Sequence, residues 1–162
     1  MKSTIGTIAV IIVLAGCITP ELPPAPIPFT EAEFKAYEGR GTARIIGQAF
    51  LKTRGGDVKT GAGNFVMLLP STPYTLELRR RMQHGEKLPA LAGTPLAKYM
   101  RTTTADAGGN FEFSELPAGQ YYMNCIITWE VPSQYGPEST GGVAYGDATV
   151  SEGQTVKVIV TR

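Results

Sequence analysis

The side chains that most often perform catalysis are scarce in this sequence. It contains one histidine, His84, in the polar context Gln83-His84-Gly85. A serine–histidine–aspartate triad would have to use His84, and the sequence contains no G-x-S-x-G nucleophile motif. Zinc sites with recognisable spacing use several histidine or cysteine ligands, and the sequence contains no such arrangement. We therefore expect no metal, no cofactor and no enzymatic activity, and we interpret His84 as a surface residue.

Two further groups of residues have the composition of a functional site without its spacing. The glycine-rich run 55–63 lacks the order G-x-x-x-x-G-K-S/T of a phosphate-binding loop, so we interpret it as a flexible hairpin loop. Asp106, Asn110 and Glu112 carry oxygens that suit calcium, but the EF-hand pattern is absent. A pair of carboxylates that hydrolyses glycosides need not be close in sequence, and it stays an alternative without a supporting motif.

The first of the two cysteines, Cys17, follows a short apolar run. Lys2 precedes the apolar residues 5–15, a run shorter than the roughly 20 residues that span a bilayer and suited to a signal peptide. The order Leu14-Ala15-Gly16-Cys17 resembles the lipobox of bacterial lipoproteins. The resemblance implies a signal peptide at 1–16 and fatty acyl chains, palmitate among them, on Cys17. An ordinary signal peptide or a short anchor with an incidental cysteine is the alternative.

Residues 17–40 are expected to tether the rest of the chain to a membrane. More than one acyl chain gives stable anchoring. Because Ile18 rather than aspartate follows the cysteine, the lipoprotein sorting rule implies the outer membrane of a Gram-negative cell, on its periplasmic side. Five prolines in 19–28 predict an extended, semi-rigid spacer. Thr30 and Glu33 have the spacing of a capping box and predict a short helix through residue 37.

The strongest local pattern of the chain lies between residues 104 and 121. Asp106 and Asn110 flank two glycines in a predicted turn, and the phenylalanines that follow alternate with polar residues as in a half-buried strand. The spaced residues of this stretch are Asp106, Gly109, Phe111, Phe113, Leu116, Pro117, Gly119 and Tyr121. Their pattern resembles the signature of carboxypeptidase regulatory-like domains. The resemblance implies a β-sandwich of transthyretin-like topology that serves as an accessory module, and it says little about function.

Residues 41–162 are expected to form one all-β domain. The predicted strands are 42–52, 65–69, 99–104, 110–114, 120–130, 142–150 and 155–161, which suit a seven-stranded Greek-key sandwich. A helical insertion is predicted at 73–83 and a loop at 88–95.

Alternation within two of these strands predicts which side chains face the core. The odd residues 121–129 and the valines 156, 158 and 160 should face inward. The second cysteine, Cys125, then lies in the core as an inert thiol, with an intermolecular disulfide as the alternative.

Two surface features are candidate contact sites. Arg79, Arg80 and Arg81 form a basic run on the predicted helix, which is either a solvated face or a contact for anionic lipid, lipopolysaccharide or an acidic protein. Trp129 either packs at the edge of the core or lines a cleft with Tyr135 and Tyr145.

Three functions remain open on the sequence alone. Fifteen basic and fourteen acidic residues nearly balance, which gives no electrostatic case for nucleic acid. The leading hypothesis is a lipid-anchored structural or protein-interaction module that binds other envelope proteins, with strand 42–52 as an exposed edge and 135–142 as contact loops. The alternative is a lipoprotein that binds a glycan or a small apolar ligand. An accessory enzyme is the third reading, and we expect no activity.

Overall fold

The computed structural model describes residues 27–88 and 90–162. The predicted signal peptide, the lipobox at 14–17 and most of the proline-rich tether lie outside these residues, so those assignments stay predictions. In the part of the chain that is described, no helix is both long and apolar enough to cross a membrane.

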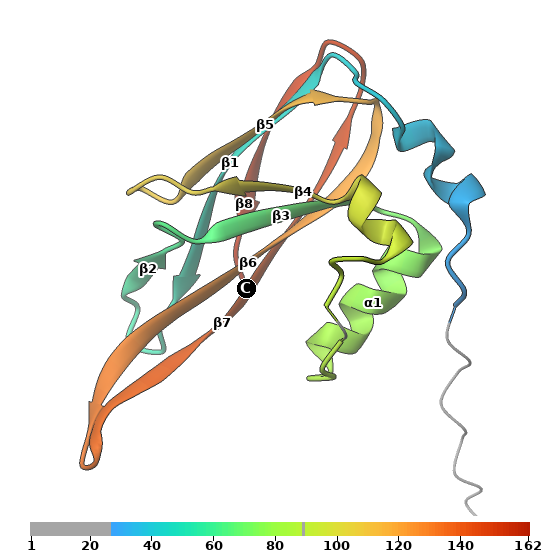
Figure 1. Ribbon diagram of the computed structural model, residues 1–162. Helices are drawn as coiled ribbons and strands as arrows, with labels where there is room; N and C mark the ends of the chain where they lie inside the picture. The colour runs from blue at the N-terminus through green and yellow to red at the C-terminus, as the bar shows by residue number, and fades with distance from the viewer. Residues whose placement is uncertain (1–26, 89) are drawn as a thin grey trace, which may run out of the picture.

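Two four-stranded sheets enclose the core (Figure 1). The first sheet contains β1 (Ala43–Lys52), β2 (Val58–Thr60), β5 (Asn110–Leu116) and β8 (Thr155–Val160). In this sheet β1 pairs antiparallel with β2 and β5 and parallel with β8. The second sheet has the order β4 (Arg101–Thr104), β3 (Phe65–Pro70), β6 (Gly119–Ser133) and β7 (Gly136–Val150), and all its neighbours are antiparallel. The described residues therefore form the predicted all-β sandwich.

The first sheet differs from the prediction in two respects. Over the described residues there are eight strands instead of seven, because β2 forms within the glycine-rich run that we interpreted as a loop. Three residues are too few for alternation to reveal a strand. The predicted exposed edge at 42–52 is also wrong, since β5 and β8 both pair with β1. The alternation of apolar and polar residues identifies the two faces of a strand, but it does not indicate whether the edges of the strand are paired.

The second sheet extends further than predicted. Residues 136–142 belong to β7 and not to a loop, and β6 runs on to Ser133. Pro132 and Pro137, which suggest a loop, face each other in a two-stranded ribbon. Among the described residues no third strand pairs with this part of the ribbon, and unpaired edges tolerate proline. Tyr99 does not begin the predicted strand 99–104; it ends a 3-10 helix, η2 (Pro95–Tyr99), that begins with proline.

The core between the sheets confirms the predicted inward faces. Tyr121, Met123, Cys125 and Ile127 are at most 3% exposed, and Val158 and Val160 are also buried. Trp129 and Val156 are half-buried and pack against this cluster. Burial raises the pKa of the Cys125 thiol to about 11, so the group stays protonated at neutral pH. Its burial fits the interpretation as an inert core residue.

A second apolar cluster covers the outer face of the second sheet. Three helices lie there: η1 (Glu31–Tyr37), α1 (Pro73–Gln83), with the bounds that the sequence predicts, and η2 (Figure 1). The buried members of the cluster are Phe34, Leu69, Leu78, Leu96, Tyr99 and Tyr122. The capping box predicted for η1 is wrong, because Thr30 makes no side-chain cap hydrogen bond. The fully buried ring of Phe34 fixes this helix instead, 4.7 Å from the ring of Tyr99.

Candidate functional site

The turn before β5 is built by one carboxylate. Asp106 Oδ1 accepts hydrogen bonds from the backbone amides of Gly108 and Asn110, each at 2.8 Å, and from Asn110 Nδ2 at 3.0 Å. These bonds, led by those from Asn110, hold the pKa of Asp106 below its ordinary value. Gly109 has φ +78°, and a Cβ there would lie 2.5 Å from the carbonyl oxygen of Ala49. Asp106 and Gly109 therefore act here as turn residues that dock β5 on β1.

The remaining signature residues fix the next turn and the core. Phe111, Phe113 and Leu116 are buried between the sheets. The Tyr121 hydroxyl donates a 2.8 Å hydrogen bond to the carbonyl oxygen of Pro117. Gly119 leaves room for the ring of Tyr37, which would lie 2.5 Å from a Cβ at that position. These residues thus act in the turns and in the core of the sandwich.

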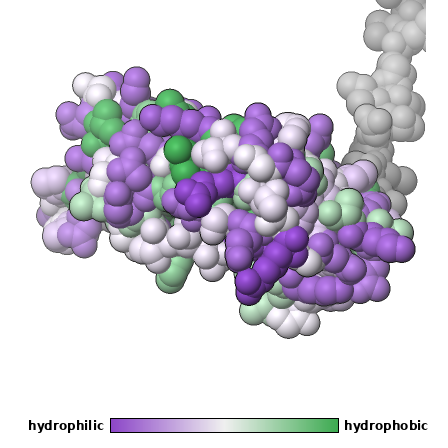
Figure 2. All heavy atoms as spheres, turned by 90° about the horizontal axis from the view of Figure 1, so that it is seen from above, coloured by the Kyte–Doolittle hydropathy of each residue, from purple (hydrophilic) through white to green (hydrophobic). Residues whose placement is uncertain are grey.

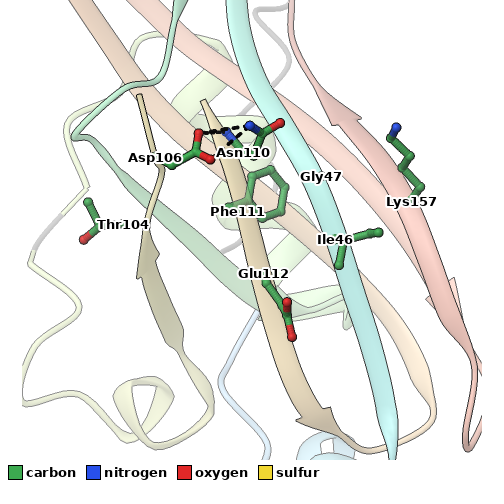
Figure 3. A pocket seen from close by; sticks show the side chains of 8 residues that line it. All are labelled: Ile46, Gly47, Thr104, Asp106, Asn110, Phe111, Glu112 and Lys157. Atoms are coloured by element: carbon green, nitrogen blue, oxygen red, sulfur yellow. Dashed lines mark hydrogen bonds between the residues drawn. The ribbon is translucent and has the colours of Figure 1, made fainter. Parts of the chain in front are cut away.

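An open groove of about 460 Å³ lies beside the first of these turns, on the outward-facing side of the first sheet (Figure 3). Thr104 and Asp106 lie on one side of β5, Asn110 and Glu112 belong to β5 itself, and Lys157 projects from β8 on the other side (Figure 3). The lining residues are Ile46, Gly47, Thr104, Asp106, Asn110, Phe111, Glu112 and Lys157. Their exposed polar atoms can donate and accept hydrogen bonds over a shallow surface.

Two carboxylates, Asp106 and Glu112, and one amine, Lys157, line the groove. Glu112 and Lys157 are both exposed, and Glu112 forms an ion pair with Arg44 at 3.2 Å. Ile46 lies between their strands and gives the floor an apolar part. Within 27–88 and 90–162, no three histidine, cysteine or acidic side chains converge as metal ligands. The arrangement suits the binding of a polar ligand.

The structure places all three arginines of the basic run in ion pairs. Arg79 binds Asp147 of β7, and its guanidinium lies 5.7 Å from the ring centre of Tyr122 and 5.3 Å from that of Tyr145. Arg80 and Arg81 pair with carboxylates of neighbouring residues, Glu77 at 2.7 Å and Glu86 at 2.6 Å. Contact with an anionic partner stays a prediction, and these pairs reduce the positive charge available for it.

The three aromatic candidates do not come together. Trp129 packs against the core, Tyr145 lies under Arg79, and Tyr135 is 92% exposed at the tip of the β6–β7 hairpin. His84 follows the end of α1, where its Nδ1 contacts the carbonyl oxygen of Arg80 at 2.7 Å. His84 is exposed, in agreement with the prediction that it is a surface residue.

Sequence reasoning missed the groove residues Ile46, Thr104 and Lys157. Lys157 alternates with the core valines, which predicts that it is exposed. No signal in the sequence indicates that β8 lies beside β1, and that pairing is what brings Lys157 near Glu112. When a site depends on the pairing of strands that are far apart in the sequence, no local sequence pattern indicates it.

Comparisons with known proteins support the sandwich fold. No protein-family model and no curated protein matches this chain. The chain is similar to a Pseudomonas aeruginosa protein that is described, provisionally, as carbohydrate binding, with 28% identity, a TM-score of 0.74, and coverage of 85% of this chain and 100% of that one.

Two pilins are more distant. The major pilin subunit of Bacillus cereus is 18% identical with a TM-score of 0.41, over 75% of this chain and 29% of the pilin. A streptococcal ancillary pilin is 15% identical with a TM-score of 0.32, over 75% of this chain and 30% of the pilin. At these scores neither pilin informs the function.

Proposed function

We propose that this chain is a non-catalytic module of the bacterial cell envelope that binds carbohydrate. The observation that carries the proposal is the similarity to the Pseudomonas aeruginosa protein, which extends over the whole of that chain. The finer assignment, a Greek-key domain of the carboxypeptidase regulatory-like type, is also a proposal. Its support is the turn geometry of Asp106, Gly109 and Tyr121.

The groove beside Asp106 is the site that we assign to the carbohydrate. Sugars present several hydroxyl groups at once, and a few well-placed polar side chains fix their orientation. Glu112 can accept hydrogen bonds from hydroxyls and Lys157 can donate to them, and both side chains are exposed at the groove. Hydrogen bonds to charged groups contribute about 1.5–3 kcal/mol each, enough to dominate the affinity of a weak glycan site.

Isothermal titration calorimetry with soluble peptidoglycan fragments and lipopolysaccharide core oligosaccharides tests this assignment. The double variant Glu112→Gln, Lys157→Ala should bind at least tenfold more weakly than the wild type. Lys52→Ala is the matched control, because it removes an exposed lysine of the same sheet that does not line the groove, and it should leave affinity unchanged. Unchanged affinity in the double variant would place the site elsewhere. A wild type that binds no glycan of the panel would refute carbohydrate binding itself.

A protein-interaction module is the second candidate, and the β6–β7 hairpin favours it. The pairing of β3 with β6 ends at Cys125, whereas β6 and β7 stay paired as far as Ser133 and Gly136. The ribbon therefore projects from the sandwich (Figure 1). The face seen in Figure 2 is mainly hydrophilic with scattered hydrophobic residues, which argues against a broad apolar interface there. The exposed tip at Tyr135 is the natural contact point.

The location belongs to the same proposal. We place the module on the periplasmic side of the outer membrane, held by acyl chains on Cys17 and spaced from the lipid by the proline-rich tether. The lipobox residues Leu14, Ala15 and Gly16 and the identity of Ile18 support this placement.

A further inference from the structure

A second cavity lies on the opposite sheet, between α1 with the segment after it and the outer face of β3, β6 and β7. Its volume is about 410 Å³, within the range of small-molecule sites. Met67 and Val143 line it from the sheet, and Leu78, Met82 and Leu91 line it from the helix and the segment that follows. Methionine side chains adapt their shape to irregular ligands. Unlike the groove, this cavity is mainly apolar.

One amide interrupts the apolar lining. Asn124 points outward from β6 into the cavity and is only 5% exposed. Among the described residues its sole side-chain hydrogen bond runs from Nδ2 to the sulfur of Met67 at 4.0 Å, a weak contact. A carboxamide can donate two hydrogen bonds and accept two, and burying it without partners is unfavourable. Most of the hydrogen-bonding capacity of Asn124 therefore faces the cavity without a partner among the described residues.

The charged groups at the cavity are already neutralised. Glu86, the acidic residue of the lining, pairs with Arg81 at 2.6 Å. Arg79 pairs with Asp147 across the gap between α1 and β7, and its side chain is 19% exposed. The same ion pair holds α1 against β7, and the guanidinium of Arg79 lies over the rings of Tyr122 and Tyr145. A charged ligand would gain no partner from these groups.

From these observations we infer that the cavity is a second ligand site, for a small uncharged molecule that is mainly apolar and carries one hydrogen-bonding group, such as a phenol. The hydrocarbon part contacts the leucine and methionine side chains, and Asn124 supplies the hydrogen bond. The inference is independent of carbohydrate binding in the groove. The two sites lie on the outer faces of different sheets, so either can be lost without the other.

The test compares p-cresol with toluene, which differs from it by the absence of the hydroxyl group. Saturation-transfer NMR detects binding, and titration gives the dissociation constants. The wild type should bind p-cresol at least fivefold more tightly than toluene. Asn124→Leu should remove this preference and keep toluene binding. Its melting temperature should equal or exceed that of the wild type, because the buried amide is gone.

Two further variants locate the site. Val143→Phe fills the cavity and should abolish binding of both probes; if that variant does not fold, Met82→Phe replaces it with the same expectation. Ile126→Ala is the matched control, since Ile126 is the next outward residue of β6 and is 58% exposed outside the lining, and binding should be unchanged. The inference is overturned if the wild type binds neither probe, if the filled variant still binds, or if Asn124→Leu keeps the preference for p-cresol.

Discussion

The hydroxyl of Tyr121 holds the turn between β5 and β6 through its bond to Pro117. The side chain is 3% exposed, and burial raises the pKa of its hydroxyl well above the ordinary value, so the group stays a donor. Tyr121→Phe keeps the ring and its edge contact with Tyr37 but leaves the carbonyl unpaired. We expect the free energy of unfolding to fall by about 1–2 kcal/mol in urea denaturation. Tyr135→Phe, at the exposed tip, should change nothing, and equal stability of the two variants would contradict this role.

At the scale of elements, the β6–β7 ribbon is the part that fits a protein partner. A photo-crosslinking amino acid at Tyr135 should capture a discrete set of envelope proteins in cells, because this side chain is 92% exposed on a projecting hairpin. The same group at Val58, which is 53% exposed on β2, is the matched control and should capture none of that set. Identical patterns from both positions, or none from either, would remove the ribbon as a specific contact.

Some elements of this structure can be predicted from the sequence, and others cannot. Asp106 and Tyr121 form hydrogen bonds with backbone groups four residues away, so their types and spacing predict both turns. The bounds of α1 can also be predicted, because Pro73 suits the start of a helix and Gly85 lies just after its end. The burial of Asn124 cannot be predicted in this way. Alternation in the strand predicts that this residue is exposed, and it is buried because α1 packs over the outer face of β6. The groove escapes prediction for a similar reason, since it depends on the pairing of β1 with β8.

For the whole molecule, the proposed anchor depends on one residue, Cys17. Cells expressing the wild type should incorporate a labelled palmitate analogue into the protein, and the protein should sediment with the outer membrane. Cys17→Ala should abolish the label and release the protein from that fraction. Cys125→Ala is the control, because it removes the other cysteine, which is buried in the core, and it should keep both properties. Label retained by Cys17→Ala would refute the lipobox assignment.

The parallel pairing of β1 with β8 also bears on how the chain reaches this structure. The first strand of the sandwich completes its hydrogen bonding only with the last. Contacts between residues so far apart in the sequence form slowly, since a long loop must close before they contribute. The β6–β7 hairpin can form early from adjacent residues, whereas the first sheet must wait for residues 155–160. For an exported chain, as we propose, this delay keeps the domain open until its end has been synthesised.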